Sequence, residues 1–101
     1  MNGGLVCAEP NPNWRSLDLG TLKVTMTVNG KALKDKNRGH PLGDPLAVAV
    51  EMANMWRSKG GVRAGQVVTC GSYTGLDYVK PGDTCEMTFE GLGTATVKFT
   101  V

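Results

Sequence analysis

The strongest constraint on the fold is one segment with helix signals at both ends, GDPLAVAVEMANMWRSKGG. Asp44 is a suitable N-cap because its carboxylate accepts hydrogen bonds from free backbone amides, and Pro45 fits the first turn, where its missing N–H costs nothing. At the other end, Lys59 complements the negative end of the helix dipole, and Gly60 can take the left-handed conformation that ends a helix. We therefore predict one main α-helix over about residues 44–59.

Apolar residues surround more of this helix than one packed face needs. One face carries Leu46, Ala49, Val50, Ala53 and Trp56, and Val48, Met52 and Met55 lie beside it. A helix that is apolar over so wide an arc normally buries more than one side. We therefore expect it to pack against a β-sheet and against a second chain.

Alternating apolar and polar residues predict strands on both sides of the helix. Leu22 to Val28 alternates cleanly, and the Asn29-Gly30 pair that follows favours a tight hairpin because both residues tolerate positive φ. The other expected strands follow this turn, lie near residues 66–70, end near Val79, or cover Cys85–Phe89 and Ala95–Val101, and residues 3–8 are a further candidate. With about six strands, this is a single α+β domain over residues 1–101, a mostly antiparallel (mixed) β-sheet or β-roll.

Composition restricts the partners that the chain can attract. Its 101 residues include eleven basic and nine acidic ones, a formal net charge of +2, which predicts no general attraction to nucleic acid or membrane. A small basic cluster, Lys31, Lys34, Lys36 and Arg38, has no interleaved aromatic residues, so we interpret it as solvated surface. The longest apolar run, around Leu46 to Val50, is too short to cross a bilayer.

The cysteine pattern indicates a reducing compartment. The sequence has an odd number of cysteines, namely Cys7, Cys70 and Cys85, and we identify no CxxC spacing and no signal peptide. We predict that all three are reduced and buried, in a cytoplasmic protein.

The segment VTCGSYTGLDYVKPGD, which begins at Val68, offers hydroxyl groups but no recognisable nucleophile. GSYTG differs from the G-x-S-x-G elbow because its serine comes one position too early. Activating Ser72 would need a base, and His40 is the single histidine. We interpret His40 as a structural donor that fixes the entry to the helix, and Ser72 and Thr74 as partners of backbone groups in a turn. We predict no catalytic residue.

The acidic residues are dispersed along the chain and form no pair that resembles a cation site. Asp44 and Asp83 are expected in a helix cap and a turn. We therefore predict no metal ion held by this chain alone.

Three segments in a fixed order resemble a known family. GHPLGDPLAVAVEMAN, AGQVVTCGSYTGLDYVKPGD and FEGLGTATVKF are similar to the C-terminal part of the 2-keto-4-pentenoate hydratase family, which includes related 2-oxo acid decarboxylases and belongs to the fumarylacetoacetate hydrolase superfamily. The start, NGGLVCAEP, resembles the family's strand beside the active site. The likeness covers essentially all of this chain but only part of the family fold.

The resemblance implies a substrate-binding loop in this chain. Gly71, Ser72 and Thr74 match the family's loop that faces the 2-oxo acid end of the substrate, and Asn2 and Gly3 match the strand beside it. The helix from Asp44 matches one that packs across the sheet. The family's divalent metal, Mg²⁺ or Mn²⁺, and its catalytic lysine are implied to lie upstream of the matched region.

Three functions of different class follow from the resemblance. The first is a truncated hydratase-like lyase domain that is not catalytic by itself. The second is a small module that binds a 2-oxo acid or another carboxylate. The third is an assembly fragment that completes a split hydratase or forms a homodimer or higher oligomer, because a chain cut from a larger sheet leaves apolar surface and strand edges uncovered.

Overall fold

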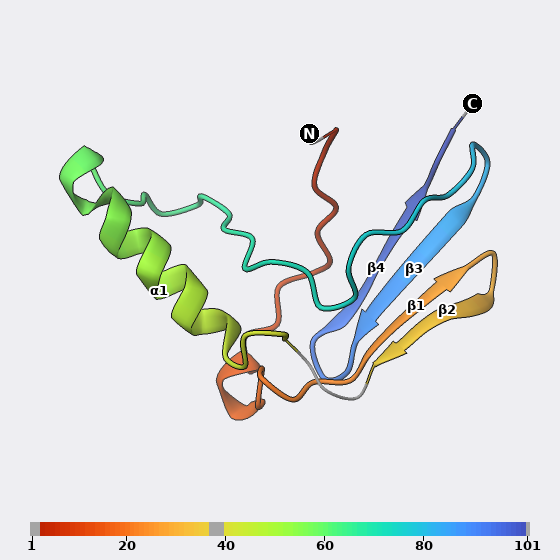
Figure 1. Cartoon of the computed structure of the whole chain (residues 1–101), viewed down its shortest axis with the longest axis horizontal. Coiled ribbons are helices and arrows are strands. Elements are labelled where there is room, and N and C mark those ends of the chain that lie inside the picture. The colour runs from red at the N-terminus through yellow and green to blue at the C-terminus, as the bar shows by residue number, and fades with distance from the viewer. Residues whose placement is uncertain (1–2, 37–39, 101) are drawn as a thin grey trace.

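The computed structural model describes residues 3–36 and 40–100 (Figure 1). Its elements in chain order are η1 (Trp14–Ser16), β1 (Val24–Val28), β2 (Lys31–Lys36), α1 (Pro45–Trp56), η2 (Arg57–Lys59), β3 (Thr84–Phe89) and β4 (Gly93–Lys98). The predicted α+β class, with one main helix and an antiparallel sheet, is confirmed. No helix in the described part of the chain is long and apolar enough to cross a membrane.

The four strands form one antiparallel sheet in the order β2-β1-β3-β4. The predicted hairpin joins β1 and β2, and Asn29 and Gly30 have φ values of 52° and 82°, as a tight hairpin turn requires. The central pairing joins β1 to β3, across more than fifty residues of sequence, and sets Met26 opposite Met87.

The sheet has one apolar face and one hydroxyl-rich face, because side chains alternate along each strand. On the apolar face Val24 is completely buried and Cys85 nearly so. On the other face Thr25, Thr88 and Thr94 lie side by side in register, and the hydroxyls of Thr88 and Thr94 are 2.8 Å apart. The core of the molecule therefore sits on one side of the sheet.

Helix α1 begins at the predicted cap, but it ends at Trp56, and the remaining predicted residues up to Lys59 form η2. The carboxylate of Asp44 accepts a hydrogen bond from the amide of Leu46 at 2.9 Å, and Pro45 occupies the first turn. Gly60 is left-handed, with φ of 99°, and the amide of Gly61 donates to the carbonyl of Trp56 at 2.8 Å. Both ends are therefore capped within the chain itself.

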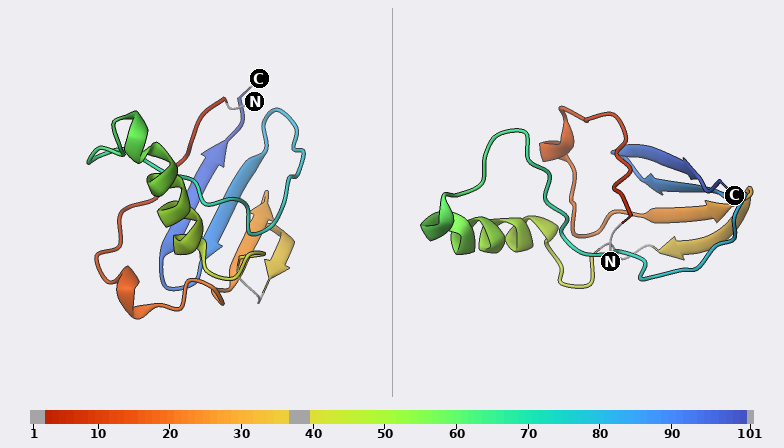
Figure 2. Two further views of the ribbon diagram at one scale, coloured as in Figure 1. Left: turned by 60° about the vertical axis from the view of Figure 1, so that its left-hand side comes forward. Right: turned by 90° about the horizontal axis from the view of Figure 1, so that it is seen from above.

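The expectation that this helix packs across the sheet is wrong. Figure 2 shows α1 projecting to one side of the sheet, and its close element contact is with η2. Leu46, Val50 and Met55 are 40%, 59% and 70% exposed. The less exposed side of α1, which includes Met52, lies instead beside the segment of residues 60–68 that follows the helix.

The strands expected near residues 3–8, 66–70 and 79 are also absent from the described structure. A segment with strand-forming residues becomes a strand only where a neighbour completes its hydrogen bonds, and these segments form no strand in the described structure. Residues 66–70 lead from the α1 side of the molecule back to the sheet (Figure 1). The N-terminal segment is tied to the β3–β4 turn by Asn11, whose side-chain amide donates to the carbonyl of Gly91.

Candidate functional site

The loop of residues 70–75 is organised around the hydroxyl of Ser72. Its Oγ accepts hydrogen bonds from the amides of Thr74 and Gly75 at 3.2 and 2.7 Å, and it donates to the carbonyl of Gly75 at 2.9 Å. Two backbone N–H groups therefore converge on one oxygen atom. This confirms the interpretation of Ser72 as a turn residue.

Gly71 is required by a close approach. Its φ of 92° lies in the left-handed region, and a β-carbon there would come within 3.3 Å of Nε2 of His40. A side chain at this position would thus meet both backbone strain and a fixed neighbour. The glycine lets the imidazole of His40 lie directly against the loop.

His40 is buried, with 5% of its surface exposed, and it joins two stretches of backbone. Nε2 lies 2.5 Å from the carbonyl oxygen of Cys70, and Nδ1 accepts a hydrogen bond from the amide of Leu42 at 3.1 Å. Because a carbonyl oxygen only accepts, Nε2 must carry the proton and Nδ1 must be bare. The contacts therefore select the neutral imidazole with its proton on Nε2.

Tyr73 continues this contact into the sheet. Its ring meets the rings of His40 and Phe89 edge to face, each at a centroid distance of 5.2 Å, and its hydroxyl donates to the carbonyl of Leu19 at 2.9 Å. Burial, and to a smaller extent the nearby Cys70 and Asp44, raises the pKa of Tyr73 above its usual value. Tyr73 is therefore a neutral donor that holds the loop on the sheet.

The structure brings together only some of the residues that the resemblance implies for a substrate site. Gly71, Ser72 and Thr74 lie in one loop, and Thr74 is buried. Gly3 lies in open space, since a β-carbon there would meet nothing within 4 Å. Asn2 lies outside the described residues.

Sequence reasoning assigned His40 to the helix entry and missed Tyr73. The hydrogen bond to Cys70 shows that His40 fixes the loop as well as its own turn. Tyr73 carried one usable signal, because an aromatic residue between two hydroxyl residues of a glycine-rich loop needs a surface to pack on.

The cysteines are free, as predicted, but only Cys85 is buried. Cys7 is exposed on the N-terminal coil and Cys70 is half-buried, so the prediction of burial is wrong for Cys7. Burial, and secondarily the charge of Asp83, raises the pKa of the Cys85 thiol.

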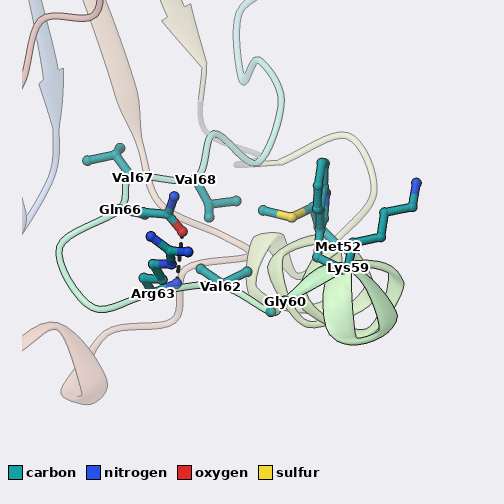
Figure 3. Close-up of a pocket in the computed structure, with 10 residues that line it drawn as sticks. Met52, Lys59, Gly60, Val62, Arg63, Gln66, Val67 and Val68 are labelled. Carbon is teal, nitrogen blue, oxygen red and sulfur yellow. Dashed lines mark hydrogen bonds between the residues drawn. The ribbon is translucent and has the colours of Figure 1, made fainter.

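A separate cavity of about 390 Å³ lies at the C-terminal end of α1 (Figure 3). Met52 points from the helix toward Val68, and Val62 and Arg63 close another side. Nζ of Lys59 sits 5.3 Å from the centre of the Trp56 ring. This cavity belongs to the helix and the segment that returns from it, and it does not include the loop of residues 70–75.

The residues that the structure describes offer no set of metal ligands, because no three His, Cys, Asp or Glu side chains come together among residues 3–36 and 40–100. They therefore do not fit the divalent cation that the family resemblance implies.

Comparison with known proteins gives a consistent result. A family profile described as fumarylacetoacetate (FAA) hydrolase C-terminal matches residues 3–100. The chain is 32% identical over 88 residues to 4-oxalocrotonate decarboxylase of Pseudomonas putida, covering 86% of this chain and 33% of that protein. It is 34% identical over 86 residues to 2-keto-4-pentenoate hydratase of Paraburkholderia phymatum, covering 84% and 33%.

A solved structure shares the fold. It is 4-oxalocrotonate decarboxylase from Pseudomonas putida G7, complexed with calcium and acetate, with a TM-score of 0.71 and 31% sequence identity over 84% of this chain and 33% of that chain. The chain thus spans about a third of the length of these two curated relatives and of this structure.

Proposed function

Because the chain belongs to the fumarylacetoacetate hydrolase C-terminal family, as a hydratase- and decarboxylase-like domain, we propose that it binds the carboxylate of a 2-oxo acid and does not catalyse a reaction alone. The binding group is the loop of Gly71, Ser72 and Thr74. The amides of Thr74 and Gly75 now donate to Ser72 Oγ, and a carboxylate oxygen would use them as donors by taking the place of that hydroxyl oxygen.

The chemistry of the relatives supports a carboxylate ligand. Their names, 4-oxalocrotonate decarboxylase and 2-keto-4-pentenoate hydratase, describe carboxylate substrates, and the solved relative is complexed with acetate. A loop with backbone donors and hydroxyl groups suits such an anion without a full positive charge. The convergence of two amides on one oxygen atom is the observation on which the proposal depends.

The absence of independent catalysis is proposed from the donor set. The family resemblance implies Mg²⁺ or Mn²⁺ and an upstream lysine, whereas the described residues provide no three-ligand cluster. We therefore assign this chain the substrate-holding role, with the metal ligands and the catalytic lysine supplied from outside the described residues.

The binding proposal can be tested by NMR titration of the full chain with sodium pyruvate. We expect the amide signals of Thr74 and Gly75 to shift most, while signals from the outer face of α1 stay in place. Pyruvamide, which keeps the 2-oxo group but lacks the charge, is the matched control and should shift them less. Equal shifts with both compounds, or none with pyruvate, would contradict the carboxylate site.

The catalytic part of the proposal has a direct assay. We expect the purified chain with Mg²⁺ or Mn²⁺ to show no turnover of 2-hydroxypenta-2,4-dienoate above the rate in buffer. Turnover that is metal-dependent and scales with protein concentration would contradict it.

A second candidate function is assembly, and the exposed side of α1 favours it. Leu46 and Val50 form an apolar stripe one turn apart, and both are exposed. We propose that this stripe is covered by self-association of the chain or by a second polypeptide that supplies the rest of a hydratase. We place this assembly in the cytoplasm. Light scattering at micromolar concentration should show a homodimer or larger, and Val50→Glu should shift it toward monomer. A monomeric wild-type chain would leave only the second polypeptide as cover.

A further inference from the structure

The position of the loop of residues 70–75 on the molecule is set by contacts from outside the loop. It lies in a long stretch of coil between α1 and β3 with no strand of its own. Its hydroxyl-centred turn uses bonds between neighbouring residues, and such short-range bonds do not fix where the turn sits on the molecule. The contacts that do so are made by His40 and Tyr73.

His40 makes the first of these contacts. Its Nε2–H bond to the carbonyl of Cys70 spans thirty residues and reaches the residue just before the turn. Its other ring nitrogen is held by the amide of Leu42, which fixes the plane of the imidazole. That ring also lies nearly perpendicular to the ring of Tyr73, inside the turn, at a centroid distance of 5.2 Å. His40 therefore helps to set the position of the turn, together with Tyr73, whose hydroxyl donates to the carbonyl of Leu19.

We propose that His40 is the positioning residue of the carboxylate-binding loop, and that its Nε2–H bond to Cys70 holds the amides of Thr74 and Gly75 ready for a ligand. This inference rests on the proposed function for the ligand itself, but it adds a residue that makes no contact with the ligand. Apparent affinity falls in proportion to the fraction of molecules whose site is preformed, so loosening the loop weakens binding without removing any ligand donor.

Two amide variants separate the two nitrogen atoms. In His40→Gln, the side-chain NH₂ group can reach the position of Nε2 and donate to Cys70, while the acceptor for Leu42 is lost. In His40→Asn, the side-chain oxygen can replace Nδ1 as the acceptor, while the donor to Cys70 is lost. We expect pyruvate to bind His40→Gln within about threefold of wild type and His40→Asn at least about fivefold more weakly, the value of one lost hydrogen bond.

A second measurement needs no ligand. The hydrogen-exchange rates of the Thr74 and Gly75 amides in the free protein report whether the turn is held. We expect His40→Asn to exchange at these amides about fivefold faster than wild type, and His40→Gln to stay near wild type. If wild type does not bind pyruvate, the proposed function fails, and these rates still decide the role of His40.

Leu22→Ala is the control for a merely structural effect, because it removes a buried side chain that makes no hydrogen bond to the loop. It should lower Tm at least as much as His40→Asn while leaving pyruvate affinity and the two exchange rates near wild type, all measured well below each Tm. Equal behaviour of His40→Gln and His40→Asn, or a loss of binding in Leu22→Ala as large as in His40→Asn, would overturn the proposal.

Discussion

The sheet and helix α1 have equally clear apolar patterns in the sequence, but only the sheet uses its pattern to bury apolar side chains. In the sheet, the apolar alternation of β1 and β3 meets in register and leaves Val24 completely inaccessible. In α1, the caps are formed at both ends, yet the stripe of Leu46 and Val50 stays exposed. Local signals therefore determine that an element forms, whereas burial depends on what else is present to cover it.

The difference also explains how the candidate site is built. The loop of residues 70–75 follows the coil that returns from α1, but Tyr73 attaches it to Phe89 of the sheet. The sheet therefore holds the loop in place, whereas α1 contributes exposed surface. A loop anchored in this way can keep its place whether or not the exposed side of α1 is covered.

The largest expected effect is the difference between a valine-to-alanine substitution in the sheet and the same substitution in α1. Val24→Ala removes methyl groups from a completely buried position and should lower the free energy of unfolding by about 2 kcal/mol. Val50→Ala changes a position that is 59% exposed and replaces valine by a better helix former, so its effect should lie within about 0.5 kcal/mol. Urea unfolding followed by fluorescence measures both.

Protein concentration sharpens this comparison. At concentrations where the chain is monomeric, Val50→Ala should be nearly neutral, and a cost that appears only at higher concentration would identify a second copy as the cover. A cost at Val50 equal to that at Val24 in the monomer would show that α1 packs on the chain itself, against the arrangement in Figure 2.

The next effect in size is confined to the helix half. Asp44→Ala removes the side-chain acceptor for the amide of Leu46 and should destabilise α1 by about 1 kcal/mol. Because α1 does not rest on the sheet, hydrogen exchange should speed up in α1 and stay unchanged in β1 and β3. Asp44→Asn keeps an acceptor and should restore most of the protection. Equal acceleration in helix and sheet would show one cooperative unit instead of two.

The sequence predicted those parts of the fold that depend on neighbours in the chain. The caps of α1, the Asn29-Gly30 hairpin and the alternation of β1, β3 and β4 all follow from residues within a few positions of each other. It failed for residues 66–70, whose β-branched residues resemble those of a strand, because whether a strand forms there depends on a neighbour that the described chain does not provide.

The site was predicted in part for the same reason. The turn of Ser72 is local and was expected from the residue types alone. The contact between His40 and Cys70 joins positions thirty residues apart, and nothing in the spacing of one histidine reveals it. Gly71 belongs to the local turn, but a glycine is needed there because the tertiary structure brings His40 close to it.

The smallest expected effect tests a turn at the edge of the sheet. Asp83 accepts hydrogen bonds from the amide of Lys80 and the side-chain amide of Asn29, each at 2.8 Å, so it ties the β1–β2 turn to the turn before β3. The bond from Lys80 first, and that from Asn29 second, lower the pKa of Asp83 below its ordinary value of 3.8.

A carboxyl group with a lowered folded-state pKa stabilises the protein above its unfolded pKa and loses that contribution as the pH falls through the folded value. Wild type should therefore have a slightly higher Tm than Asp83→Asn at neutral pH, and this difference should shrink only below pH 3.8. The effect is small because Asp83 is only half-buried, so solvent still screens its charge. Glu51→Gln, at an exposed acidic residue of α1, controls for the general loss of negative charge. A difference that disappears already near neutral pH would show that the carboxylate of Asp83 does not hold the two turns together.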